Sequence, residues 1–246
     1  MNQEERWILE EKYKGQECEA FLADCQRLTA GEPLAYIIGY VPFLNATIYL
    51  DSHPLIPRTE TEFWVEKAIN EMQIAPIANP KILDLCAGSG CIGVAVAKAV
   101  PSADIDFIEI DSVHNSTIYR TIVSNAIDLD RCRIITSDLF SELGKEKYDY
   151  ILTNPPYIDS ALDRTELSVK MHEPHIALYG GSRGLATIQK IIQDASAHLT
   201  PHGVLYIEHE PEQDSVIMSC AAKQNFAITA HKDQYDITRY SRLESL

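Results

Sequence analysis

The sequence predicts an α/β fold in which helices cover both faces of a mostly parallel β-sheet. Three observations support this prediction. From residue 81 onward, short apolar segments alternate with longer segments of helical periodicity. A glycine-rich loop follows the first apolar segment and leads into a helix of small residues. The length of 246 residues suits one sizeable domain with a small attachment.

The chain before residue 81 differs in character from the rest. Apolar residues in segment 1–30 fall at loosely helical spacing, and Gly31 and Pro33 end that stretch. Segments 43–50 and 55–56 are predicted to be short strands around a turn at 51–54, which together form a hairpin. A helix is expected over 60–72 and a proline-containing loop over 75–80. We therefore expect a short helical segment at 1–32, a hairpin connector at 33–62 and the main domain at 63–246.

The main domain alternates predicted strands and helices. Strands are predicted at 81–85, 104–110, 133–136, 148–153, 203–209, 226–231 and 238–244. Helices are predicted at 92–100, 113–127, 184–199 and 212–224.

The composition narrows the classes of function. The formal net charge of −15 weighs against a protein that grips a phosphate backbone and favours a basic protein partner. None of the six cysteines forms a CxxC pair, and the segment His172 to His175 is not a zinc motif, so no metal is expected. The sequence shows neither a signal peptide nor a membrane-spanning run, and we expect a cytoplasmic protein.

The loop from Asp84 to Gly90 follows a predicted strand and opens a helix, which is typical of a nucleotide-cofactor site. About 20 residues later, Asp111 ends the next strand, where a carboxylate can hold a ribose diol. The spacing Gly88-x-Gly90-x-x-Gly93 also fits a nicotinamide dinucleotide, so a dehydrogenase stays open at this point. Two further acids favour S-adenosylmethionine. Asp84 could face its methionine end or orient the loop, and Asp138 could accept a hydrogen bond from its adenine.

The predicted strand 148–153 leads directly into Asn154-Pro155-Pro156-Tyr157. Ligands of open α/β sheets bind beyond the carboxyl ends of the strands, so this loop is where a second substrate would meet the cofactor. An amide nitrogen is a poor nucleophile and must be held with its lone pair toward the reacting methyl group. The Asn154 side-chain oxygen and the Pro155 carbonyl can accept its two hydrogens, and Tyr157 offers a flat face. An ordinary strand-ending turn is the alternative interpretation.

With these motifs in place, the sequence resembles the protein-glutamine N5-methyltransferases that act on peptide chain release factors, the HemK or PrmC family. The resemblance runs from about Pro33 to the C-terminus. It is carried by the segments 33–39, 56–62, 84–90, 154–158, 173–178, 180–185 and 208–209. The glycine loop and the Asn-Pro-Pro-Tyr motif are shared with adenine-N6 methyltransferases, whereas segments 33–39 and 56–62 are more specific to the glutamine enzymes.

The resemblance implies a Rossmann-like, seven-stranded class I methyltransferase that uses S-adenosylmethionine and releases S-adenosylhomocysteine. The implied contacts with glutamine are Asn154, Pro155, Pro156 and Tyr157. The implied contacts with the cofactor are Ala87, Gly88, Ser89, Gly90, Asp111, Asp138, Leu139 and Asn154. Asp84 is added to this predicted site because of its position before the glycine loop. The implied substrate is the glutamine of a Gly-Gly-Gln loop in a release factor, and we expect the enzyme to act as a monomer.

Three departures from the family pattern stand out. Cys86 occupies the position of the first loop glycine, Thr59 replaces a proline after Arg58, and only about 30 residues precede Pro33 where the family has a larger helical domain. In the family that domain helps to recognise the release factor, so the sequence does not determine which protein is the substrate. The alternatives are an adenine-N6 methyltransferase on RNA or DNA, a nicotinamide-dependent dehydrogenase, and a non-catalytic binding module that kept the fold.

Overall fold

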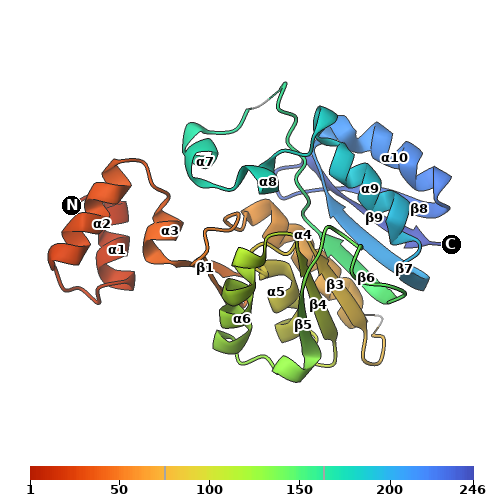
Figure 1. Cartoon of the computed structure of the whole chain (residues 1–246), viewed down its shortest axis with the longest axis horizontal. Helices are drawn as coiled ribbons and strands as arrows, with labels where there is room; N and C mark the ends of the chain where they lie inside the picture. The colour runs from red at the N-terminus through yellow and green to blue at the C-terminus, as the bar shows by residue number, and fades with distance from the viewer. Residues whose placement is uncertain (75, 163) are drawn as a thin grey trace.

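The computed structural model describes residues 1–74, 76–162 and 164–246. Within these residues the chain forms a seven-stranded sheet, a separate two-stranded hairpin and helices on both faces of the sheet (Figure 1). The strand order is β5-β4-β3-β6-β7-β9-β8. The neighbours from β5 to β7 are parallel, whereas β9 runs antiparallel to β7 and β8. The strands are Lys81–Leu85 (β3), Asp104–Glu109 (β4), Cys132–Thr136 (β5), Tyr148–Thr153 (β6), Leu199–Glu208 (β7), Phe226–Lys232 (β8) and Thr238–Ser245 (β9).

Two hydrophobic cores lie on the two faces of this sheet. Successive strand residues point to opposite faces, so Phe107 and Leu152 pack into one core and Ile108 and Ile151 into the other. Helices α4, α5 and α6 cover the first face, and α9 and α10 cover the second (Figure 1). These helices span Thr59–Ile74 (α4), Cys91–Ala99 (α5), Asn115–Ser124 (α6), Ala186–Ala195 (α9) and Asp214–Lys223 (α10). The predicted α/β class is therefore confirmed.

The chain reverses its direction of winding at β3. Strands β4 and β5 lie on one side of β3, and β6 lies on the other. In open α/β sheets such a switch point leaves a crevice beyond the carboxyl ends of the strands. The glycine loop after β3, residue Glu109 at the end of β4 and the Asn-Pro-Pro-Tyr loop after β6 all lie at this edge.

The N-terminal segment forms a small helical unit at one side of the molecule (Figure 1). Its helices are α1 (Gln3–Glu11), α2 (Glu19–Thr29) and α3 (Leu34–Ile38). Ile8, Phe21 and Ile37 form its own core, and the nearby Asp24 carboxylate accepts hydrogen bonds from Lys12 and Tyr13. The sequence predicted helix for residues 1–30 but did not predict α3.

The connector forms a hairpin, but the predicted turn was misplaced. Strands β1 (Tyr40–Phe43) and β2 (Ala46–Tyr49) pair around a two-residue loop at Leu44 and Asn45. Leu44 adopts a positive φ of 49°, and its N–H donates to the Glu62 carboxylate. The predicted strand at 55–56 is wrong, because the Ile56 N–H donates to the Glu173 side chain instead of a strand partner.

Other element boundaries also differ from the prediction. Two short helices that the sequence did not indicate, α7 (Leu167–His172) and α8 (His175–Leu178), follow the Asn-Pro-Pro-Tyr loop. Strand β7 begins at Leu199 rather than Gly203, and α4 begins at Thr59, a first-turn position that suits the family's proline as well. The predicted loop at 75–80 includes Ala75, which lies outside the described residues. Short 3-10 turns occur at Ser112–His114 (η1), Leu129–Arg131 (η2), Ser182–Gly184 (η3) and Pro211–Gln213 (η4).

In the part of the chain that the structure describes, no helix has the length and apolar character needed to cross a bilayer.

Candidate active site

A cavity of about 340 Å³ opens beyond the carboxyl ends of β3, β4 and β6. The glycine loop and the end of β4 form one wall, and the loops after β5 and β6 form another. Leu55 of the connector and Pro174, Ile176 and Ala177 around α8 close it from outside. The cavity therefore lies where the switch point of the sheet predicts a ligand.

The loop from Cys86 to Gly90 turns sharply at the base of this cavity. Cys86, Gly88 and Gly90 all have positive φ, of 63°, 54° and 77°. Only glycine reaches this region without strain, so Cys86, which stands where the family has glycine, is held in an unfavourable conformation. Cys86 also lines the cavity, and burial raises the pKa of its thiol to about 12.

Gly93, the third glycine of the Gly88-x-Gly90-x-x-Gly93 pattern, is required for helix–sheet packing and not for the approach of a ligand to the backbone. A Cβ atom on Gly93 would lie 2.4 Å from the Phe107 ring, so helix α5 can only approach β4 this closely with glycine there. At Gly88, in contrast, a Cβ would meet nothing within 4 Å, which leaves its backbone open to the cavity. Ala87, Ser89 and Gly90 shape the loop but do not line the cavity themselves.

The acid that faces the cavity at the end of β4 is Glu109, not the predicted Asp111. Glu109 lines the cavity, and its carboxylate accepts hydrogen bonds from the N–H groups of Gly88 (2.7 Å) and Asp111 (3.0 Å). Asp111 is not a lining residue; it is exposed, and its side chain accepts from the Val113 N–H at 3.0 Å, where it caps a short turn. Glu109 was not predicted as a site residue because the strand was expected to run to residue 110, whereas β4 ends at Glu109.

Asp84 lies behind the glycine loop rather than in the cavity. Its side chain is fully buried, and Oδ2 accepts from the Gly93 N–H at 2.8 Å while Oδ1 has no partner among the described residues. Burial raises the pKa of Asp84 to about 8, opposed by the Gly93 hydrogen bond and supported by the charge of Glu109. Of the two roles considered for Asp84, this position favours orienting the loop over facing the cofactor.

Asp138 and Leu139 line the opposite wall of the cavity. The Asp138 carboxylate is largely exposed and accepts from the Lys190 ammonium group at 3.0 Å. Lys190, from α9, is itself a lining residue that sequence reasoning did not single out.

The Asn-Pro-Pro-Tyr loop separates this cavity from a second one. Asn154 and Pro156 line the first cavity, Pro155 is buried, and Tyr157 lines the second. The Asn154 amide nitrogen donates to the Thr61 hydroxyl at 3.1 Å, and the Tyr157 hydroxyl donates to Glu208 at 3.0 Å. Neither Thr61 nor Glu208 was predicted as a site residue from the sequence.

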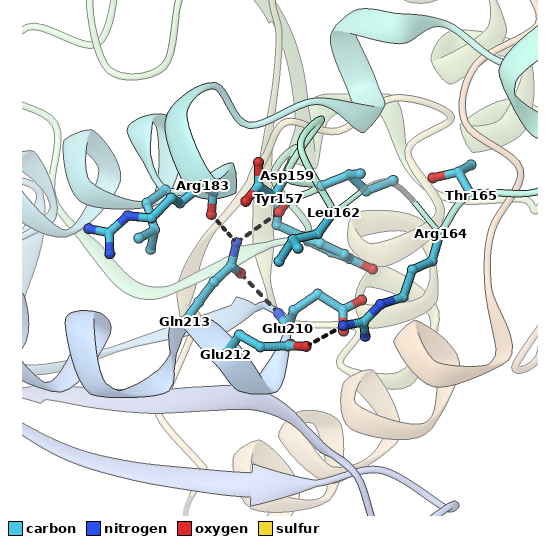
Figure 2. Close-up of a pocket in the computed structure, with 11 residues that line it drawn as sticks. Tyr157, Asp159, Leu162, Arg164, Thr165, Arg183, Glu210, Glu212 and Gln213 are labelled. Carbon is cyan, nitrogen blue, oxygen red and sulfur yellow. Dashed lines mark hydrogen bonds and ion pairs between the residues drawn. The ribbon is translucent and has the colours of Figure 1, made fainter.

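The second cavity has a volume of about 320 Å³ and lies beside Tyr157 (Figure 2). Gln213 crosses its back wall, where its amide nitrogen donates to the carbonyls of Tyr157 (2.8 Å), Arg183 (3.1 Å) and Gly184 (3.1 Å). The Gln213 side-chain oxygen accepts from the Glu210 N–H at 3.0 Å. This one buried side chain fixes the backbone after the Asn-Pro-Pro-Tyr motif against two other loops.

The connector is fastened to the outer wall of the first cavity by Glu173. The Glu173 carboxylate, almost fully buried, accepts from the Arg58 guanidinium at 2.6 Å and from the Ile56 N–H at 2.9 Å. Leu55 and Pro174, the chain neighbours of this contact, both line the cavity. The segments 56–62 and 173–178, which carried part of the resemblance, therefore meet in space.

These residues fit S-adenosylmethionine. Gly88 leaves its backbone open, the carboxylates of Glu109 and Asp138 lie in the walls, and Ile110 adds an apolar surface that is about half exposed. The Glu109 carboxylate can accept hydrogen bonds from a ribose diol and the Asp138 carboxylate from an adenine amino group, and the Ile110 side chain can pack against the adenine ring. Among the described residues, no group of three or more His, Cys, Asp or Glu side chains is placed to hold a metal.

Comparison with known proteins defines the class. A model of the methyltransferase small domain matches residues 67–174, which include the glycine loop, Glu109 and the Asn-Pro-Pro-Tyr loop. A solved structure, the T. thermophilus 16S rRNA N2 G1207 methyltransferase with AdoMet and guanosine, has a TM-score of 0.60 at 17% identity. It covers 84% of this chain and 50% of that one, and supports the fold alone. The chain is a Rossmann-like, S-adenosylmethionine-dependent methyltransferase.

One relative then defines the family, and a second is similar. The release factor glutamine methyltransferase of Francisella tularensis is 37% identical over 200 residues, which cover 81% of this chain and 69% of the relative. The chain belongs to the release factor glutamine methyltransferase family. The ribosomal protein uL3 glutamine methyltransferase of Bradyrhizobium diazoefficiens is 32% identical over 189 residues, which cover 74% of this chain and 59% of that relative.

Proposed function

We propose that this enzyme transfers the methyl group of S-adenosylmethionine to the side-chain amide nitrogen of a glutamine in a protein substrate. The observation that carries the proposal is the position of Asn154. It lines the cofactor cavity, and its amide nitrogen is turned away toward Thr61, which leaves the side-chain oxygen as an acceptor for an incoming N–H group. Both relatives described above are named as glutamine methyltransferases.

In the proposed reaction, S-adenosylmethionine supplies an electrophilic methyl group in the first cavity. Asn154 Oδ1 and the Pro155 carbonyl accept the two hydrogens of the substrate amide, which directs the nitrogen lone pair toward that methyl group. Tyr157, in the wall of the second cavity, packs against the group that carries the amide. One amide proton leaves to solvent as the new carbon–nitrogen bond forms, and no general base is required.

The proposal assigns the cofactor diol to Glu109 instead of Asp111. Glu109 lines the cavity and its two oxygens are already oriented by backbone N–H groups. Each carboxylate oxygen can accept a further hydrogen bond from a ribose hydroxyl. Asp138, Leu139 and the Gly88 backbone complete the proposed cofactor site, and Asp84 supports it from behind.

The glutamine of a Gly-Gly-Gln loop in a release factor is the proposed substrate. A ribosomal protein glutamine is the second candidate, because one of the two relatives is named for that substrate. We further propose that the enzyme acts as a monomer in the cytoplasm, where protein synthesis supplies both candidates.

A methylation assay with mass spectrometry tests the function. Purified enzyme and S-adenosylmethionine are mixed with a release factor, with ribosomal protein uL3 or with an adenine-containing oligonucleotide. We expect one added methyl group on the release factor glutamine, and none when Asn154 is replaced by Ala while S-adenosylmethionine still binds. Methylation of the oligonucleotide alone would overturn the glutamine assignment in favour of an adenine-N6 activity, and methylation of uL3 alone would change the protein substrate.

A further inference from the structure

A buried chain of hydrogen bonds connects Asn154 to the end of strand β7. The Asn154 amide nitrogen donates to Thr61 Oγ1 at 3.1 Å, and the Thr61 hydroxyl donates to Glu208 Oε2 at 2.7 Å. The Trp64 indole N–H donates to the same carboxylate oxygen at 2.6 Å, and the Tyr157 hydroxyl donates to Glu208 Oε1 at 3.0 Å. Thr61, Trp64 and Glu208 are each no more than 1% exposed.

The donor and acceptor in each hydrogen bond of this network are fixed by the chemistry of the Trp64 indole and the Glu208 carboxylate. An indole N–H can only donate and a carboxylate can only accept, so Trp64 and Glu208 fix the polarity at one end. A threonine hydroxyl has a single proton, and Thr61 uses it toward Glu208. Only the lone pairs of Thr61 then face Asn154, which must present its NH2 group to them.

The ionised form of Glu208 is the one that the surrounding groups support. Burial raises the pKa of Glu208 above its usual value, and the hydrogen bonds from Trp64, Thr61 and Tyr157, with the charge of Arg239, reduce that rise without reversing it. A carboxylate that accepts three hydrogen bonds keeps its charge more readily than burial alone would allow.

We propose that Glu208 and Thr61 are positioning residues, which hold the Asn154 amide in the one orientation that presents its oxygen to the substrate. The proposal rests on the proposed function in one respect only: the substrate is taken to offer an N–H group. In the flipped orientation Asn154 would turn its own NH2 group toward the substrate NH2 group, and no hydrogen bond could form. Neither residue lines either of the two cavities.

The test compares variants of Thr61. Thr61→Val and Thr61→Ala remove the hydroxyl, whereas Thr61→Ser keeps it. Without the hydroxyl, the Asn154 amide is free to flip, and its Oδ1 no longer accepts a hydrogen bond from the substrate amide. We expect kcat to fall by about tenfold or more in the first two variants, because a hydrogen bond that is worth about 1.4 kcal/mol is lost from the transition state. The dissociation constant for S-adenosylmethionine should stay unchanged, and Thr61→Ser should restore turnover. Thr121→Val is the matched control: Thr121 is equally buried, its hydroxyl accepts from the Tyr49 N–H at 3.2 Å, and it lies outside the site.

A second measurement does not depend on catalysis. In the wild-type enzyme, NMR should show a side-chain NH2 signal of Asn154 that is protected from solvent exchange, assigned by its loss in Asn154→Asp. The signal should lose its protection in Thr61→Val and keep it in Thr61→Ser. Wild-type Asn154 protons that exchange like those of an exposed amide, or full turnover in both hydroxyl-free variants, would overturn the proposal. A wild-type enzyme that shows the protected signal but does not methylate glutamine would contradict the proposed function and leave the positioning role intact.

Discussion

Glu109 and Gly88 are joined by a hydrogen bond of 2.7 Å from the backbone N–H of the glycine to the carboxylate. The residues are 21 positions apart in the sequence, and both line the first cavity, where we propose that the cofactor binds. The bond means that the proposed diol-binding acid also fixes the loop that approaches the cofactor. Loss of Glu109 should therefore affect cofactor binding in two ways at once.

The first prediction compares the two acids after β4. Glu109→Ala should weaken S-adenosylhomocysteine binding by about 100-fold or more, because Glu109 can accept two hydrogen bonds from the diol and hydrogen bonds to a charged group contribute about 1.5–3 kcal/mol each. Asp111→Ala should change the affinity little, since Asp111 does not line the cavity. Isothermal titration calorimetry measures both constants. A larger loss in Asp111→Ala would return the diol-binding role to that residue.

The second prediction concerns Gly184, which lies against the end of the Asn-Pro-Pro-Tyr loop. Gly184 has a φ of 66°, and a Cβ atom there would lie only 1.8 Å from the Tyr157 carbonyl oxygen. Gly184→Ala should lower the free energy of unfolding by about 3 kcal/mol or more, since overpacking adds to backbone strain. Denaturant unfolding measures it.

Gly144→Ala is the matched control for Gly184. Gly144 has a φ of 58°, but a Cβ atom there meets nothing within 4 Å. Backbone strain alone should cost about 1–2 kcal/mol. Equal losses in the two variants would show that the contact with Tyr157 is not what requires glycine at position 184.

The third prediction concerns the pH dependence of stability. The pKa of Asp84 is raised to about 8 in the folded protein, above the value of about 3.9 expected for an unfolded chain. Between these values the folded state holds a proton that the unfolded state has released, so this group lowers stability as pH rises. Asp84→Asn removes the titration but keeps an acceptor for the Gly93 N–H. The melting temperature of the wild type should therefore fall relative to that of Asp84→Asn from about pH 5 to about pH 8. Parallel profiles would mean that Asp84 is ionised in the folded protein.

The fourth prediction concerns the contact that fastens the connector to the cavity wall. Glu173→Ala removes the partner of Arg58 and of the Ile56 N–H, and leaves that partly buried N–H without its acceptor. We expect the free energy of unfolding to fall by about 2–4 kcal/mol and S-adenosylhomocysteine to dissociate faster, because Leu55 and Pro174 wall the cavity. Stopped-flow displacement measures the dissociation rate.

Glu212→Ala is the control for this contact. Its ion pair with Arg164 is exposed at both partners and should contribute less than about 1 kcal/mol. An unchanged dissociation rate in Glu173→Ala would show that the connector does not help to retain the cofactor.

The sequence by itself determined the features that depend on local pattern. Alternating strands and helices predicted the sheet and the helices on its two faces, because side-chain periodicity reflects burial. Glycines after the first strand and the Asn-Pro-Pro-Tyr motif after strand 148–153 located the edge where the site would form. The placement of Asn154 in the cavity wall follows from that position at a strand end.

Only the tertiary structure decided which side chains meet at that edge. Glu109 and Asp111 are two positions apart, and the choice between them depends on where β4 ends against its neighbours. Thr61 and Glu208 lie 147 residues apart, yet their side chains share a hydrogen bond. No local pattern encodes such a contact, because it arises when helix α4 packs on the sheet and brings a polar residue to the end of β7. The network that orients Asn154 is for this reason a property of the packed fold.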